Sequence, residues 1–180
     1  PTEYVVDGET VAGSPVLSSY YQSNEKIEND LFSNFYALIN VPFIKGLSYR
    51  MNYSPNLRWN HNYSYERQNK HLTNNTTWAS KNNQNAFDWV MENIIKYQKQ
   101  LNKHFFDVTM LYGRNHTFFE NTTARADRLS LDALGWDDLS LGETQITSSH
   151  GERTEGNSYM FRLNYNFINR YFLTLTARRD

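Results

Sequence analysis

The chain has 180 residues, enough for one domain, and combines 16% aromatic residues with a mean hydropathy of −0.74, so its apolar residues must be interspersed with polar ones. It has no apolar run of about eighteen residues, which excludes a transmembrane helix but leaves open a membrane protein built from strands. Eighteen Lys and Arg against nineteen Asp and Glu give no basic excess for nucleic acid, and the lack of cysteine excludes disulfide scaffolds and thiolate zinc sites.

The N-terminal segment PTEYVVDGET has neither the basic nor the apolar stretch of a signal peptide. Either export is not involved or a signal peptide lies outside this chain. The C-terminal residues TLTARRD end within a strand-like pattern, without a turn. We therefore expect the chain to be an excerpt of a longer protein.

Three pairs of strand candidates follow the N-terminal segment, and a short connection joins the two members of each pair. Apolar residues occupy every second position in residues 46–54 and in the third pair, which is typical of a strand with one apolar and one polar face. The pairs give about six strands of the length that a tilted strand needs to cross a bilayer. They are residues 30–41 with 46–54, 87–97 with 104–112, and 158–167 with 171–178.

Polar residues stand opposite an apolar and aromatic face in two of these hairpins. In the first hairpin, Arg50 and Asn52 alternate with Leu, Met and Tyr in the segment GLSYRMNYS. The third hairpin places Arg162, Asn164 and Arg178 in the same kind of alternation. A soluble sandwich would turn the polar face to bulk water, whereas an outer-membrane barrel would turn it to an aqueous lumen and the apolar face to lipid.

The connections between hairpins are much longer than the turns within them. Residues 55–86 are rich in Asn, and residues 113–157 include a predicted helix from Ala124 to Leu134. Short periplasmic turns and long extracellular loops are typical of outer-membrane barrels. Aromatic residues cluster beside the short turns, as an interfacial girdle would: Phe43, Phe167, Tyr171 and Phe172. The ordinary preference of strands for aromatic residues explains each of these positions about as well. We therefore predict an all-β fold, an antiparallel transmembrane β-barrel segment with long extracellular loops.

The titratable residues form no recognisable catalytic or metal-binding motif. The four aspartates of the second long loop match no calcium-binding loop, and we interpret them as caps and solvated side chains: Asp127, Asp132, Asp137 and Asp138. The histidines fall at no metal-ligand spacing: His61, His71, His104, His116 and His150. We predict no catalytic residue, no metal and no cofactor.

Three tryptophans lie in or beside the predicted long loops, namely Trp59, Trp78 and Trp136. An exposed aromatic ring can stack on the face of a sugar in water. Packing within the loops explains these residues equally well. Ligand contact and loop packing therefore both stand as interpretations.

Several stretches resemble the SusC/RagA-like TonB-dependent transporters of Bacteroidota outer membranes. The resemblance rests on NFYALINVPFIKGLSYRMNYS, on DALGWDDLSLG and on SYMFRLNYNFINRYFLTLTARRD, whose closing RRD lies where that family has a similar strand ending. The segment YVVDGET is similar to a short sequence segment of the family's plug domain. Because it stands directly before barrel-like sequence, we interpret it as a loop.

The resemblance implies a 22-stranded barrel closed by an N-terminal plug, in the cell outer membrane and in contact with its lipid. Such a protein is not an enzyme. It imports glycan or peptide fragments with a SusD-like surface lipoprotein and takes energy from TonB through its N-terminal part. We expect residues 1–180 to be a partial β-barrel domain, with the plug and the remaining strands absent from this sequence. The residues expected to line the lumen are Arg50, Asn52, Arg162, Asn164 and Arg178.

Two other classes of protein remain open. One is a soluble, aromatic-rich β-sandwich that binds carbohydrate. The other is a β-rich glycoside hydrolase that uses loop carboxylates such as Asp137 and Asp138. Dependence on detergent separates the membrane protein from both, and hydrolysis of polysaccharides separates the hydrolase from the binding module.

Overall fold

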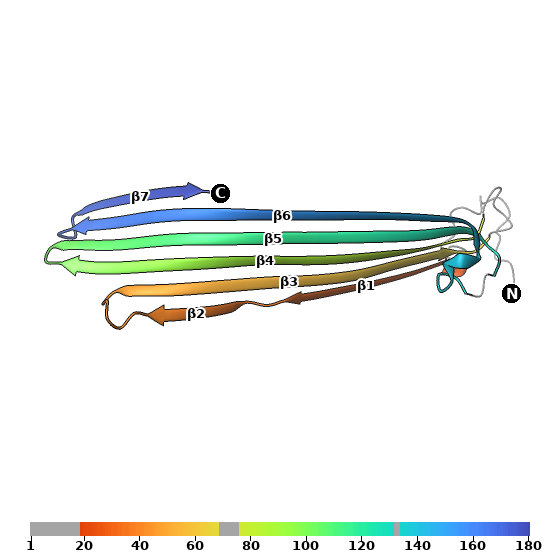
Figure 1. Ribbon diagram of the computed structural model, residues 1–180, viewed down its shortest axis with the longest axis horizontal. Helices are drawn as coiled ribbons and strands as arrows, with labels where there is room; N and C mark the ends of the chain where they lie inside the picture. The colour runs from red at the N-terminus through yellow and green to blue at the C-terminus, as the bar shows by residue number, and fades with distance from the viewer. Residues whose placement is uncertain (1–18, 69–75, 132–133) are drawn as a thin grey trace. The chain divides into compact units, whose positions relative to one another are not determined.

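A computed structural model describes residues 19–68, 76–131 and 134–180, and this part of the chain is all-β and antiparallel (Figure 1). The segment YVVDGET, interpreted above as a loop, lies outside the described residues. The strands form one seven-stranded sheet in the order β1-β3-β4-β5-β6-β7, with β2 also paired to β3. None of the helical turns in the described residues is long and apolar enough to cross a membrane. The elements are β1 (Gln22–Phe32), β2 (Phe35–Asn40), β3 (Leu47–Glu66), β4 (Trp78–Leu101), β5 (His104–Leu129), the short 3-10 helix η2 (Leu139–Leu141), β6 (Gly142–Phe167) and β7 (Tyr171–Arg179).

The strands run much further than the sequence predicted. β3 and β4 have 20 and 24 residues, and β5 and β6 have 26 each, so most of the predicted loops 55–86 and 113–157 belong to strands. The predicted helix is wrong as well, because Ala124 and the residues that follow it up to Leu129 lie in β5. Thr123, directly before the predicted helix, accepts a hydrogen bond from Asn82 Nδ2 across the sheet at 2.7 Å. Cross-strand pairs of this kind give polar residues partners in a sheet, and they override the loop and helix preferences of the local sequence.

The first predicted strand is interrupted. Residues 30–41 fall on β1 and β2, with a break at residues 33 and 34. The Ser33 N–H donates to the Pro55 carbonyl at 3.0 Å, so the hydrogen bonds to β3 continue at the break. β2 then pairs with β3 from Phe35↔Tyr53 to Asn40↔Ser48, as the predicted hairpin requires.

The last hairpin agrees closely with its prediction. β6 pairs with β7 from Tyr159↔Arg179 to Phe167↔Tyr171. Ile168 and Asn169 between them have φ angles of 57° and 55°, as a type I′ turn needs. The Asn169 N–H donates to Asn166 Oδ1 at 2.9 Å, which holds this turn closed.

The chain divides into two compact units. We call residues 30–57, 86–119 and 152–180 the turn unit, because they contain the three short hairpin turns. The loop unit comprises the described residues within the ranges 1–29, 58–85 and 120–151. The loop unit contains a hydrophobic cluster, in which Ala79 and Ala126 are fully buried beside Tyr65. Trp136 from the β5–β6 connection packs against this cluster. The small alanines leave room for the two large rings.

Gly46 in the β2–β3 turn provides a test of this fold. Its φ of +89° is unfavourable for any residue with a Cβ, and a Cβ there would collide with the Gln98 backbone carbonyl. Gly46→Ala should therefore lower the free energy of unfolding by at least about 1–2 kcal/mol. The measurement is a urea unfolding curve of the refolded protein in detergent. Gly156→Ala is the control, since the atoms nearest to a Cβ there belong to the Asn115 side chain, which can move. Equal destabilisation by both changes would contradict a special role for the Gly46 backbone.

Candidate functional site

One face of the turn unit is polar and hydrogen-bonded. Arg50 and Asn52 lie on β3, where Arg50 Nε donates to Asn52 Oδ1 at 2.8 Å. Asn52 Nδ2 in turn donates to Glu92 Oε2 on β4 at 3.1 Å. On the third hairpin, Thr174 Oγ1 donates to Asn164 Oδ1 at 3.0 Å. The structure thus gives defined polar partners to several of the residues that the sequence singled out.

The remaining predicted residues lie on the same side of the β6–β7 hairpin. Arg162 pairs in register with Thr176, and Arg178 pairs with Met160. Arg178 Nε also lies 2.9 Å from Asp180 Oδ2. Because register partners point to one face of an antiparallel pair, Arg162, Asn164 and Arg178 share this face with Thr174 and Thr176.

Sequence reasoning missed the contribution of the hairpin formed by β4 and β5 to this polar face. Asp107 on β5 accepts a hydrogen bond from Gln98 Nε2 at 2.9 Å and lies 3.6 Å from Lys96 Nζ. Glu92 belongs to the same face through Asn52. The signal was present in the sequence, since Glu92, Lys96 and Gln98 all occupy even-numbered positions of one strand.

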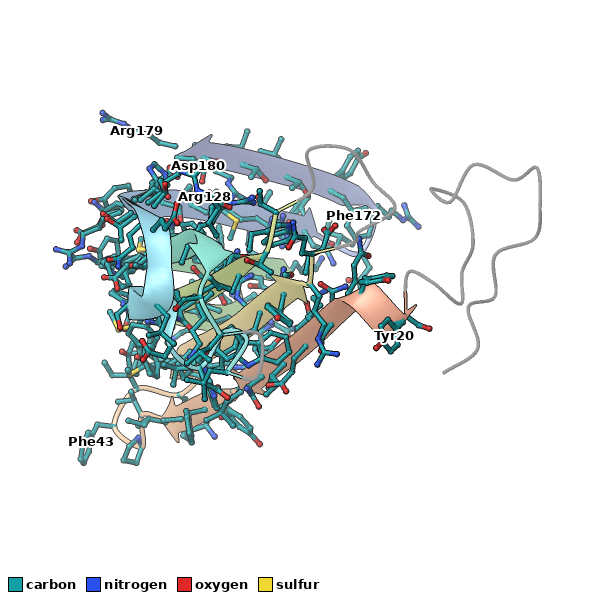
Figure 2. All side chains as sticks on the ribbon, turned by 90° about the vertical axis from the view of Figure 1, so that its right-hand side faces the viewer. Tyr20, Phe43, Arg128, Phe172, Arg179 and Asp180 are labelled. Atoms are coloured by element: carbon teal, nitrogen blue, oxygen red, sulfur yellow. The ribbon has the colours of Figure 1, made fainter. Side chains whose placement is uncertain are left out.

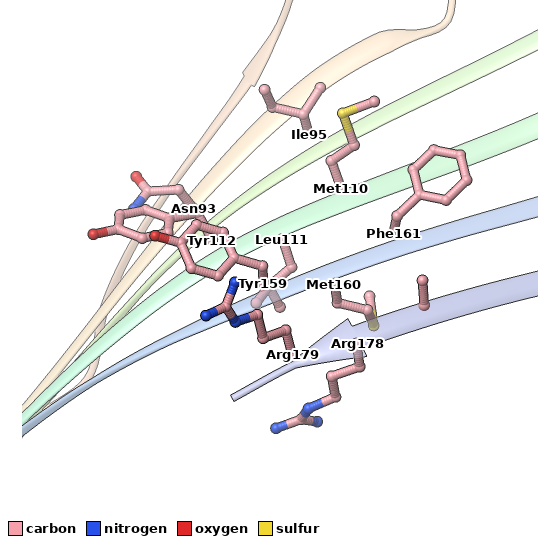
Figure 3. Close-up of a pocket in the computed structure, with 11 residues that line it drawn as sticks. Asn93, Ile95, Met110, Leu111, Tyr112, Tyr159, Met160, Phe161, Arg178 and Arg179 are labelled. Carbon is pink, nitrogen blue, oxygen red and sulfur yellow. The ribbon is translucent and has the colours of Figure 1, made fainter.

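The opposite face of the turn unit is aromatic and apolar. The rings of Tyr53 and Trp89 lie 6.1 Å apart, and those of Tyr112 and Tyr159 lie 5.3 Å apart. Met110 on β5 is 49% exposed, although it is apolar. Figure 3 shows Met110 on one side of the strands and Arg178 on the other. An exposed apolar face that crosses several strands is the kind of surface that meets a partner or a lipid phase.

Exposed aromatic residues also flank the short turns. Phe43 is 91% exposed and projects from the β2–β3 turn (Figure 2). Tyr171 and Phe172 follow the β6–β7 turn and are 67% and 73% exposed. Three of the four residues of the predicted girdle are therefore exposed, whereas Phe167 is partly buried. The contact of these residues with a membrane interface stays a prediction.

The tryptophans occupy different environments from those expected. Trp59 lies on β3 and Trp78 on β4, so their placement in loops was wrong. Trp78 Nε1 donates to Glu66 Oε2 at 3.0 Å, and the Arg125 guanidinium lies 4.4 Å from the ring centre. Trp136 does lie in a connection, where it packs against the cluster of the loop unit. Contact of these rings with a ligand stays a prediction.

The loop unit holds a hollow of about 230 Å³ bordered mainly by amide and charged side chains. Its lining residues are Lys26, Glu28, Asn60, His61, Asn62, Asn82 and Gln84. Side-chain amides both donate and accept hydrogen bonds, so they match peptide groups and sugar hydroxyls alike. Sequence reasoning missed this hollow because it assigned residues 55–86 to a loop.

Two of the four aspartates that the sequence singled out, Asp127 and Asp138, have defined side-chain partners. Asp138 accepts hydrogen bonds from the Ser140 hydroxyl at 2.6 Å and the Ser140 N–H at 3.0 Å, which confirms its interpretation as a cap and lowers the pKa of its carboxyl below the usual value. Asp127 lies 2.8 Å from Arg125. Asp132 and His71 lie outside the described residues. Across the described ranges, His, Asp and Glu side chains form no group of three or more that could hold a metal.

Comparison with known proteins shows the fold. No protein-family model and no curated protein matches the chain. The structure of the RagAB peptide transporter contains a chain with a TM-score of 0.74 at 18% identity, covering 91% of this chain. The RagAB peptide importer in its closed-closed and open-open states gives TM-scores of 0.72 and 0.70, at 17% and 16% identity, covering 88% and 91% of this chain. In each case the chain spans only 18% of the length of its neighbour.

The packing of Trp136 can be tested by proteolysis. Trp136→Ala removes a ring that anchors the β5–β6 connection, at a cost of about 1.5–3 kcal/mol in local stability. A protease that cuts at aspartate should then cleave at Asp137 about tenfold faster or more, because cleavage follows the population of the open form. Trp59→Ala is the control, since that ring is 40% exposed on a strand. Unchanged cleavage in Trp136→Ala would show that the connection is held by other contacts.

Proposed function

We propose that this chain forms part of the barrel wall of an outer-membrane transporter. In this proposal residues 1–180 are a partial β-barrel domain of a longer protein that also supplies a plug and the remaining strands. The observation that carries the proposal is the two-faced turn unit, with Met110 exposed on its aromatic face and Asn52 hydrogen-bonded on its polar face. The similarity of fold to chains of the RagAB peptide transporter supports it.

The two faces suit two different solvents. The aromatic face would contact lipid, which removes Met51, Met110 and Leu163 from water without covering them by protein. The polar face would line an aqueous lumen, where the hydrogen bonds of Asn52 and Asn164 can exchange with water. Crossing the bilayer takes about 9–11 residues of a tilted strand, so strands of 20 residues or more would also extend beyond the lipid.

The alternative of a soluble carbohydrate-binding sandwich requires a second sheet, which the described residues do not form. A sandwich buries the apolar faces of two sheets against each other. The strands of the described residues form one sheet, and Met110, Tyr159 and Leu175 remain about half exposed on its aromatic face. A lipid phase accounts for this exposure directly, whereas a sandwich would need a second sheet beyond the described residues.

The cargo and the partners follow from the sequence resemblance. We propose that the whole transporter imports peptide or glycan fragments, with a SusD-like surface lipoprotein as its lid and TonB as its energy source. The amide-lined hollow of the loop unit, with Asn60, Asn62 and Asn82, has donors and acceptors for either kind of cargo. Transport of this kind needs no covalent step, so the proposal includes no catalytic residue.

Single cysteines test which face meets lipid. The chain has no natural cysteine, so Met51→Cys and Leu163→Cys can each carry a fluorophore in the assembled barrel. Both should resist a water-soluble maleimide, and a probe attached at either should be quenched by a nitroxide held in the lipid. Asn52→Cys and Asn164→Cys are the matched controls and should react with the maleimide without lipid quenching. A folded protein with no lipid quenching at Met51 or Leu163 would overturn the proposed function.

Arginine substitutions test the same assignment through assembly. Met51→Arg and Leu163→Arg would place a charge against lipid, at a cost of about 2–4 kcal/mol near the bilayer midplane. Both should lower the yield of folded barrel, measured by its heat-dependent mobility on a gel. Asn52→Arg and Asn164→Arg place the charge toward the lumen and should assemble normally. Equal loss of folded barrel in the Met51 and Leu163 variants and in the Asn52 and Asn164 variants would mean that the polar face is not in contact with water.

A further inference from the structure

The aromatic face of the turn unit contains an apolar hollow of about 500 Å³ (Figure 3). Ile95, Met110 and Phe161 line it from three neighbouring strands. Ala177 lies across from Phe161 in the β6–β7 register, and its small side chain leaves the space open. The hollow is long enough in the strand direction to include Tyr112, two residues after Met110 on β5.

Tyrosines and an arginine stand at one end of this hollow. Tyr112 and Tyr159 both line it, with ring centres 5.3 Å apart. The Tyr112 hydroxyl donates to Asn157 Oδ1 at 3.2 Å. Arg179 also lines the hollow, and its register partner is Tyr159. The end of the hollow therefore changes from apolar to polar within one or two residues of each strand.

Further positive charge follows on the same face. Arg114 is two residues beyond Tyr112 on β5, and its Nη2 lies 2.9 Å from Glu155 Oε2. Glu155 Oε1 lies 3.3 Å from His116 Nδ1. The Arg153 guanidinium lies 5.6 Å from the centre of the Phe118 ring. Arg114, Arg153 and Arg179 thus give this part of the face three positive charges, whereas Glu155 contributes one negative charge. A positive charge on His116 would add to this excess.

We propose that this place binds a membrane lipid with a phosphorylated headgroup. The acyl chain occupies the hollow beside Met110 and Ala177, and the phosphate contacts Arg179 and Arg114. The inference rests on the proposed function, because the hollow meets lipid only if the aromatic face does. It goes beyond that function by assigning a specific lipid site and the level of the lipid–water boundary on this face, at Tyr112 and Tyr159.

The chemistry of the site matches such a lipid in both parts. A guanidinium presents several N–H donors in a plane and binds phosphate oxygens strongly. The hydrogen bond from Arg114 Nη2 to Glu155 Oε2 uses one of the five N–H donors of Arg114. Tyrosine rings favour the interface, where the ring lies in an apolar layer and the hydroxyl reaches polar groups. The excess of arginine over glutamate favours an anionic headgroup over a zwitterionic one.

The experiment compares lipid selectivity in the full barrel that contains this chain. The barrel is reconstituted in bilayers of phosphatidylcholine, and spin-labelled phosphatidylglycerol and spin-labelled phosphatidylcholine are added in separate samples. Electron paramagnetic resonance then measures how much of each lipid is immobilised by the protein. We expect a preference for phosphatidylglycerol, and Arg179→Gln or Arg114→Gln should each reduce that preference by about fivefold.

Two further variants separate lipid binding from a structural role. Glu155→Gln breaks the same ion pair as Arg114→Gln but raises the local positive charge, so it should increase the preference for phosphatidylglycerol. Ala177→Phe fills the hollow and should reduce the immobilisation of both lipids. Arg128→Gln is the control, because Arg128 also forms an ion pair between β5 and β6, with Glu143 at 2.8 Å, and should leave the preference unchanged.

The outcomes distinguish the site from the proposed function. If Arg114→Gln and Glu155→Gln change the preference in the same direction, or if Ala177→Phe leaves immobilisation unchanged, the lipid site is wrong. If either of these results is found while fluorophores on Met51→Cys and Leu163→Cys are quenched by the lipid nitroxide, the proposed function still holds. Loss of quenching at both cysteines would instead overturn the proposed function and the lipid site with it.

Discussion

The register between neighbouring strands is the constraint on which the rest of this structure depends. In β6 and β7, Phe161 faces Ala177 and Leu163 faces Leu175, so the apolar residues of both strands share a face. A shift of one residue would place Arg162 among them, because side chains alternate strictly along a strand. The type I′ turn at Ile168 and Asn169 fixes this register at its start.

Cross-strand contacts explain how a chain so rich in polar residues forms strands of up to 26 residues. Asn82 pairs with Thr123 in the loop unit, and Asn52 pairs with Glu92 in the turn unit. Each pair joins two strands and satisfies side chains that would otherwise compete for backbone groups. The same pairs make the polar face suited to water, so the stability of the sheet and the proposed lining of a lumen depend on the same contacts.

The aromatic residues have different roles in the two units. In the loop unit Tyr65 and Trp136 pack around Ala79 and Ala126, which are fully buried, and so hold a connection against the sheet. In the turn unit Phe43 and Phe172 remain exposed, as do several residues of the aromatic face. Ring content alone therefore does not distinguish a core from an exposed surface. The size of the neighbouring side chains and the chain that covers them make the difference.

The sequence by itself determined the antiparallel all-β class and the hairpins β2–β3 and β6–β7. It also determined that Arg50 and Asn164 lie on polar faces of their strands and Met51 on an apolar face. These features follow from local alternation and short turns. Only the tertiary structure decided the true length of the strands, the positions of Trp59 and Trp78 on them, and the amide-lined and apolar hollows. These features depend on which strands become neighbours, and the pairing of residues far apart in the chain leaves little trace in any local pattern.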